Sequence, residues 1–160
     1  MDSGEGALAR INRQIRGLYP GYFALVMATG IISNAAWHIG HRSASDFLLG
    51  VNLVAFPLLL LALAVRMTRF RGEVFADLVN PRLVFSFFLI VPAADVFGLQ
   101  LALRGQTESA VFLWRFALAV WTLLGYASFS VLTFINTESG ADLVHGGWLI
   151  AIVGTESLVL

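Results

Sequence analysis

The sequence predicts an all-α membrane protein, a bundle of helices that crosses the bilayer several times. Hydrophobic residues make up 58% of the 160-residue chain, and mean hydropathy is +0.81, whereas soluble domains are about 45–50% apolar. Charged residues make up only 12% and lie in clusters between long apolar runs, instead of alternating with them as in amphipathic soluble helices. A soluble chain of this length has no interior large enough for so much apolar surface.

Charged and turn-forming residues divide the chain into five apolar segments, each predicted to be a transmembrane helix. A spanning helix needs about 20 residues to cross a hydrocarbon core of roughly 30 Å. The segments are Tyr22 to Ile39, Phe47 to Val65, Leu83 to Leu103, Ala110 to Ile135, and Trp148 to Leu160. We therefore expect residues 1–20 to form a cytoplasmic N-terminal segment and residues 21–160 to form a transmembrane domain.

The first segment follows a charged N-terminus, but its apolar run of about 19 residues is long enough to span the membrane. No small-residue cleavage pattern ends it, so it is predicted to be an uncleaved first span rather than a signal peptide. Thr29, Gly30, Ser33 and Asn34 recur on one side at helical spacing. Two interpretations remain open: these small and polar residues permit close helix packing, or they form a polar wall that faces water.

The second and fourth segments carry fewer polar features. Asn52 and Pro57 mark the second, and Arg115 lies near the outer end of the fourth. A long arginine side chain at such a position can extend to the membrane surface, so Arg115 is either an interfacial anchor or an anion ligand.

The third segment, which contains "FSFFLIVPAADVFG", combines a helix breaker with an acid. Pro92 removes a backbone donor, so we expect the helix to kink or open there. Asp95 follows Leu83 by 12 residues, which places it about 18 Å along a helix. Phe88, Pro92 and Asp95 share one face. An ionisable group at that depth costs roughly 2.5–3.5 kcal/mol to insert, so Asp95 is either functional or a structural acid satisfied by a neighbour.

The fifth segment, "GGWLIAIVGTESLVL", repeats this combination with Gly154 and Glu156 but is shorter than a full span. It is predicted to be a helix truncated within the membrane. Gly30, Pro92 and Gly154 are expected to interrupt the first, third and fifth spans at similar depth. The sequence therefore predicts one water-accessible path along these three spans, lined by Thr29, Gly30, Ser33, Asn34, Phe88, Pro92, Asp95, Gly154 and Glu156.

Short connections between the segments predict antiparallel helical hairpins. Arginines are concentrated on one side of the predicted bundle, with only Arg42 and Arg104 in connections on the other. Because basic residues accumulate in short cytoplasmic loops, this predicts a multi-pass protein of the cell membrane, inner or plasma, with a cytoplasmic N-terminus. The arginines of the cytoplasmic side are Arg10, Arg13, Arg16, Arg66, Arg69, Arg71 and Arg82.

Several classes of function have no support in the sequence. A formal net charge of zero gives no reason to expect nucleic acid as a partner. There is no cysteine, no phosphate-binding loop of the GxxxxGK[ST] type, no histidine pair with metal spacing and no GxSxG turn. We therefore expect no enzyme activity, no cofactor and no bound metal.

Three stretches, "PGYFALVMATGIIS", "NPRLVFSFF" and "GGWLIAIVGTESLVL", together resemble the tellurite-resistance/dicarboxylate transporter family, which includes bacterial tellurite-resistance channels, fungal malate and sulfite transporters and plant slow anion channels. The resemblance implies a trimer of ten-helix subunits, each with five hairpins around a pore and the odd-numbered helices inside. These residues would be the N-terminal half. The family's gating Phe lies on the ninth helix, so no Phe here is assigned as the gate.

The resemblance implies a channel or transporter for small anions such as C4-dicarboxylates, tellurite, sulfite or halide. Glu156 departs from the family pattern, in which an amide is more usual. A carboxylate facing an anion path repels the ion unless it is protonated or paired. Two alternatives therefore stay open: a proton-coupled carboxylate carrier that uses Asp95 or Glu156, and a truncated membrane module without transport activity.

Overall fold

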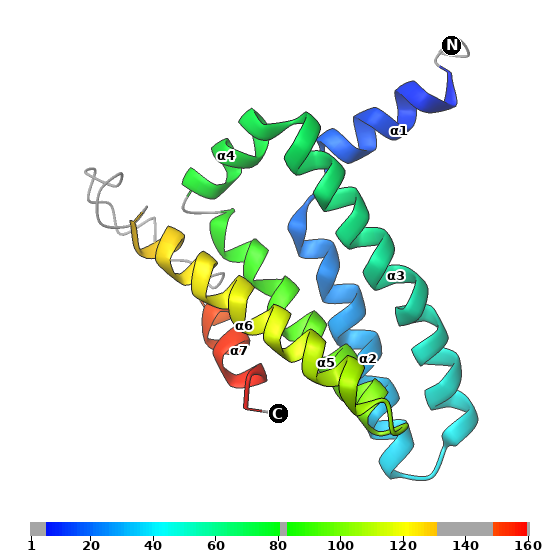
Figure 1. The fold of residues 1–160 in the computed structure, drawn as a ribbon. Helices are drawn as coiled ribbons and strands as arrows, with labels where there is room; N and C mark the ends of the chain where they lie inside the picture. The colour runs from blue at the N-terminus through cyan, green and yellow to red at the C-terminus, as the bar shows by residue number, and fades with distance from the viewer. Residues whose placement is uncertain (1–5, 81–82, 131–148, 160) are drawn as a thin grey trace.

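The computed structural model describes residues 6–80, 83–130 and 149–159, and these residues form helices without any strand. Seven α-helices and two 3₁₀ helices are present in these ranges (Figure 1). In chain order they are α1 (Ala7–Arg16), η1 (Pro20–Tyr22), α2 (Phe23–His38), α3 (Arg42–Arg69), α4 (Arg71–Val79), η2 (Val84–Leu89), α5 (Ile90–Ala102), α6 (Thr107–Ser130) and α7 (Leu149–Ser157).

Two antiparallel helical hairpins, α2–α3 and α5–α6, make up most of the bundle (Figure 1). Each hairpin turns at a glycine with positive φ, Gly40 at 87° and Gly105 at 82°. This left-handed conformation is strained for residues with a Cβ, so glycine commonly ends a helix in this way. The predicted hairpin arrangement is therefore confirmed for these two pairs.

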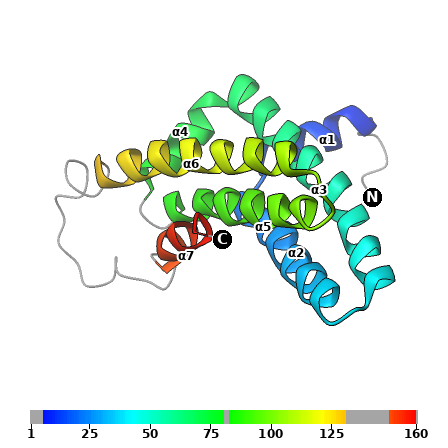
Figure 2. The ribbon, with the colours of Figure 1, turned by 60° about the horizontal axis from the view of Figure 1, so that its bottom comes forward.

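Helix α5 lies at the centre of the bundle. Within the molecule, 83% of the apolar stretch Val84–Ala102 is buried, against 22% for the corresponding stretch of α3 and 11% for that of α6. In Figure 2, α5 runs between α6 on one side and α2 and α7 on the other. The two outer helices therefore present apolar surface outward, as helices in contact with lipid do.

An aromatic cluster joins the two hairpins. The rings of Phe23 and Phe56 meet edge to face with centroids 6.1 Å apart, and the Phe56 and Phe97 centroids are 5.3 Å apart. Such pairs stabilise by about 0.5–1.5 kcal/mol beyond burial. On the other side of α5, a Cβ added at Gly98 would lie 3.4 Å from the Ala110 carbonyl oxygen, so the glycine lets α6 approach closely.

Three helices of the described residues are long and apolar enough to cross a membrane: Arg42–Arg69, Val84–Ala102 and Thr107–Ser130. They correspond to the second, third and fourth predicted segments. Helix α2 matches the first segment but has only 16 residues, and α7 contributes nine described residues to the fifth. The predicted C-terminal end of the fourth segment lies outside the described residues.

Two helices occur where the sequence analysis expected none. Helix α1 forms within the N-terminal segment, and α4 forms in the connection between the second and third segments. Both lie at the end of the bundle where most arginines were expected. Arg66 Nη2 donates to Asp77 Oδ2 over 2.7 Å, and Arg66 Nε donates to the Arg16 carbonyl over 3.0 Å. One buried guanidinium thus ties α1, α3 and α4 together.

Candidate functional site

The third span is interrupted, although not in the way that Pro92 by itself suggests. Residues Val84–Leu89 form a 3₁₀ helix, and Pro92 is the third residue of the α-helix that follows. In a first helical turn the missing N–H of proline has no intrahelical partner to lose. The break therefore precedes Pro92 as a change of helix type, which is a common hinge feature.

The expected interruptions at Gly30 and Gly154 are corrected by the structure, because α2 and α7 run through these glycines without a break. In the described residues Gly30 packs closely against α5, and Gly154 contacts η2. A Cβ at Gly30 would lie 2.5 Å from Val96 Cγ1, and one at Gly154 would lie 3.6 Å from Phe88 Cδ1. Gly30 therefore meets α5 at Val96 and Gly154 meets η2 at Phe88, about two turns apart with Pro92 between them, so the two glycines are not level as expected.

Three buried amide side chains gather beside Gly30, and we call Asn34, Asn52 and Gln100 the amide cluster. Asn52 Nδ2 donates to Gln100 Oε1 over 2.8 Å and to the Val26 carbonyl over 3.0 Å. Asn34 Nδ2 donates to the Val96 carbonyl over 3.4 Å. The cluster joins α2, α3 and α5 at a place that lipid does not reach.

The amide cluster has spare hydrogen-bonding capacity. Within the described ranges, Asn34 Oδ1, Asn52 Oδ1 and Gln100 Nε2 are buried and have no hydrogen-bond partner. Buried polar groups are normally paired with protein or ordered water. The cluster therefore offers one amide donor and two carbonyl acceptors to water or to a small polar solute.

A second polar group, the arginine clamp, lies where the two hairpin turns meet; it consists of Ser33, Ser45, Asp46 and Arg104. Arg104 donates to Asp46 Oδ1 from Nε over 3.0 Å and from Nη2 over 2.8 Å, and also to Ser45 Oγ over 2.7 Å. Ser33 Oγ donates to the Ser45 carbonyl over 2.8 Å. The clamp fixes α2 and α3 against the end of α5.

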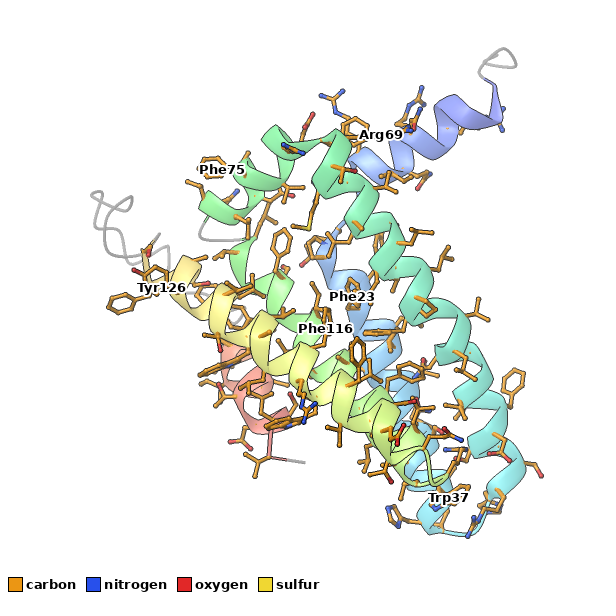
Figure 3. All side chains as sticks on the ribbon, in the orientation of Figure 1. Phe23, Trp37, Arg69, Phe75, Phe116 and Tyr126 are labelled. Carbon is orange, nitrogen blue, oxygen red and sulfur yellow. The ribbon has the colours of Figure 1, made fainter. Side chains whose placement is uncertain are left out.

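An aromatic ring lies beside the clamp. The guanidinium carbons of Arg42 and Arg104 lie 3.6 Å and 4.7 Å from the centroid of the Trp37 ring. Figure 3 labels Trp37 at this end of the bundle. Both arginines that the sequence assigned to the side opposite the N-terminus are thus held by cation–π contacts.

Asp95, the acid of α5, is buried against α7. Asp95 is 6% exposed, and Ser157 Oγ donates to Asp95 Oδ2 over 2.8 Å. In the part of the chain that the structure describes, Asp95 Oδ1 has no hydrogen-bond partner. A pocket of about 240 Å³ between α5, α6 and α7 is lined by Asp95, Ser157, Thr107 and Trp114, among others.

The remaining predicted path residues are distributed unevenly. Gly30, Ser33 and Asn34 are buried between helices, and Thr29 is half-buried. Phe88 is buried and stacks on Phe85 with ring centroids 6.1 Å apart. Glu156 is exposed, whereas the other predicted path residues lie within or beside the bundle core: Thr29, Gly30, Ser33, Asn34, Phe88, Pro92, Asp95 and Gly154.

Sequence reasoning missed two members of these sites. Gln100 was not predicted because it lies near the end of an apolar segment, where a polar residue is usually interfacial. The available signal was its spacing of four from Val96, which places Gln100 on a helix face with an apolar residue. Ser157 was overlooked because the neighbouring Glu156 carries the charge. Only the rotation of α7 about its axis shows which of the two faces Asp95.

Comparison with known proteins agrees with this architecture. A family model described as SLAC1, voltage-dependent anion channel, matches residues 17–159. Neither a curated protein nor a solved structure gives a match. The matched family is one of anion channels and transporters rather than enzymes, and it is the family that the sequence motifs resemble. The match spans most of the chain and the helices are those of a membrane protein, so this protein belongs to the voltage-dependent anion channel family.

Proposed function

We propose that this chain forms part of a transmembrane pathway for small anions, such as C4-dicarboxylates, tellurite, sulfite or halide. The family match supports anion transport in general. The observation that carries the proposal within the molecule is the amide cluster, which lies in the interior of a bundle with an apolar exterior. Polar groups at such positions in membrane proteins mark ion and substrate pathways.

The free donor of the amide cluster can bind an anion, whereas the two free carbonyl oxygens can accept hydrogen bonds from water or another donor. An amide N–H group binds an anion through its dipole without a fixed charge, so the ion can also leave, as conduction requires. Gln100 Nε2 is the donor with a free position in the described structure. The same side chain packs closely against α2, because a Cβ added at Gly30 would lie 3.4 Å from Gln100 Oε1.

The larger assembly is also part of the proposal. We take this chain, with five spans, as half of a ten-helix subunit, and we take the assembly as a trimer. The protein would cross the cell membrane several times and have its N-terminus in the cytoplasm. The burial of α5 between the exposed helices α3 and α6 supports an arrangement with odd-numbered spans inside. The arginines around α1 and α4 support the orientation.

Flux measurements on the full-length protein in liposomes test this proposal. We expect chloride, malate, sulfite or tellurite to move faster than through protein-free liposomes. Gln100→Leu should lower that flux at least tenfold, whereas Gln106→Leu, at an exposed position in the following turn, should leave it unchanged. Correctly folded protein without flux of any of these anions would contradict the proposal and favour a module without transport activity.

Thiol labelling tests the path itself. The chain has no cysteine, so single cysteines at positions 30, 34, 92 and 154 can be probed with a membrane-impermeant thiol reagent. We expect them to react faster than a cysteine at Leu118, which is on the outer helix α6. Equal rates would show that these residues serve helix packing alone.

A second candidate is a proton-coupled carboxylate carrier, and the burial of Asp95 favours it. A buried carboxyl group within a spanning helix is a common proton relay. Of the two acids considered, Asp95 is buried beside a pocket and Glu156 is exposed. Asp95→Asn should therefore abolish uptake driven by a pH gradient, and Glu156→Gln should not. Unchanged gradient-driven uptake in Asp95→Asn would exclude this candidate.

A further inference from the structure

An apolar groove runs between the two outer helices and has no role in the pathway described above. Its volume is about 410 Å³, and every described residue that lines it is apolar. The walls come from α3 and α6, the floor from the α5 region, and α4 closes one end. Its lining includes Leu63, Met67, Val74, Leu78, Phe87 and Val120. In Figure 1 the two outer helices diverge toward the end where α4 lies.

The size of the groove limits what can occupy it. Sites for small molecules have volumes of about 300–1,000 Å³, so this groove falls within their range. An α-helix is at least about 10 Å across with its side chains, so two turns of a partner helix need roughly twice the volume of the groove. A flexible hydrocarbon chain is the better match in shape and polarity.

The closed end of the groove carries positive charge. Arg71 lies on the same face of α4 as Val74 and Leu78, at spacings of three and seven. Arg69 ends α3 near this level, and Figure 3 labels it at the junction of α3 and α4, but a spacing of two from Met67 places it on a different side of α3 from the groove lining. Both arginines are exposed, and among the described residues neither forms a salt bridge.

These two arginines differ from their neighbours. Arg16 pairs with Glu73, and Arg66 pairs with Asp77, so their charges are compensated within the protein. Arg69 and Arg71 remain available to an anion at the membrane surface. Basic groups at this level bind the headgroups of anionic lipids.

We infer that the groove holds one acyl chain of an anionic phospholipid, whose headgroup phosphate is bound by Arg71, with the positive charge of Arg69 nearby at the end of α3. Lipid chains are as apolar as the groove, so burial of the chain alone gives little preference over the bilayer. The preference for this site comes from the headgroup. The inference is independent of transport activity and adds a lipid site on the outer surface between α3 and α6.

Quenching by brominated lipids tests the inference on the full-length protein. A fluorescent label on Leu123→Cys reports from the groove wall, and one on Leu118→Cys reports from another face of α6. Vesicles contain phosphatidylcholine with equal fractions of dibrominated phosphatidylglycerol or dibrominated phosphatidylcholine. We expect stronger quenching by the anionic lipid at position 123 and equal quenching by both lipids at position 118.

Substitutions of arginines separate the contribution of the lipid headgroup from that of the acyl chain. Arg71→Gln should lower the preference for the anionic lipid about fivefold, the effect of one basic residue near an anionic surface. Arg115→Gln, on α6 but outside the groove lining, should leave it unchanged. Inorganic phosphate should not displace the lipid, because the lipid is confined to the bilayer beside the site, whereas phosphate is dilute in solution.

Filling the groove with a larger side chain tests the contribution of the lipid acyl chain. Ala127 lines the groove and Ala119 does not, and each lies four residues from the label on α6. Ala127→Trp should abolish the preferential quenching, and Ala119→Trp should retain it; Ala64→Phe fills the groove from α3 if Ala127→Trp does not fold. Equal quenching by both lipids at position 123 would overturn the inference. Loss of quenching when the protein forms oligomers would also overturn the inference, because it would assign the groove to a second copy of the protein.

Discussion

Ser157 donates a hydrogen bond to Asp95 across 2.8 Å, which connects two residues 62 positions apart and joins α7 to α5. Both side chains are buried. The same hydroxyl also lies 2.9 Å from the Gly154 carbonyl oxygen of its own helix. Ser157 therefore provides a hydrogen bond to one of the two carboxyl oxygens of Asp95, Oδ2.

Removal of this hydroxyl should loosen the attachment of α7. Ser157→Ala leaves a buried carboxyl group without its partner, so we expect the free energy of unfolding to fall by about 1–3 kcal/mol. Unfolding in detergent measures this loss. Thr122→Ala is the control, because Thr122 bonds only to a carbonyl of its own helix. The interpretation fails if the two variants are equally stable.

The close contact at Gly30 predicts strong sensitivity to size. Gly30→Ala places a Cβ 2.5 Å from Val96 Cγ1, so we expect destabilisation of about 1–3 kcal/mol from overpacking. Val96→Ala in the same chain should recover part of this loss, because it removes the atom that clashes.

A matched glycine gives the control for that experiment. Gly50 lies within α3, and a Cβ there meets nothing within 4 Å. Gly50→Ala should therefore stabilise the protein by about 0.5–1 kcal/mol through its better helix propensity. A stability loss at Gly50 equal to that at Gly30 would show that backbone effects, and not the contact with Val96, explain the result.

The arginine clamp should depend more on Arg104 than on Asp46. The Asp46 side chain is 60% exposed and that of Arg104 is 14% exposed, so Asp46→Asn should cost at most about 1 kcal/mol. Arg104→Lys should cost more, because an ammonium group cannot reproduce the planar fork that reaches Ser45, Asp46 and the Gln100 carbonyl. Thermal unfolding of both variants is measured at low and at high salt. Salt screens the exposed contact with Asp46 but not the buried hydrogen bonds of Arg104, so only the effect of Asp46→Asn should shrink at high salt.

The two ion pairs at the opposite end of the bundle, Arg66–Asp77 and Arg16–Glu73, should differ in their contribution to stability. Arg66 is 5% exposed and pairs with Asp77, so Asp77→Ala leaves a buried charge and should cost about 3–5 kcal/mol. Glu73→Ala breaks the exposed pair with Arg16 and should cost at most about 1 kcal/mol. Equal losses in these two variants would contradict the assigned roles.

The sequence alone determined the class of the protein and the main helices. Apolar runs, glycines at the hairpin turns and the clustering of arginines are local properties, and each has a direct structural consequence. Gly40 and Gly105 end their helices as such residues do. The motifs of the first, third and fifth segments were sufficient to indicate the family.

Only the tertiary structure decided which polar residues meet. Helix α4, the 3₁₀ helix before Pro92 and the pairing of Gln100 with Asn52 depend on contacts between distant segments. Successive residues of an α-helix point about 100° apart, so Glu156 and Ser157 face different surroundings although they are neighbours. Composition shows that α7 carries an acid, but the rotation of α7 against α5 exposes Glu156 and directs Ser157 to Asp95.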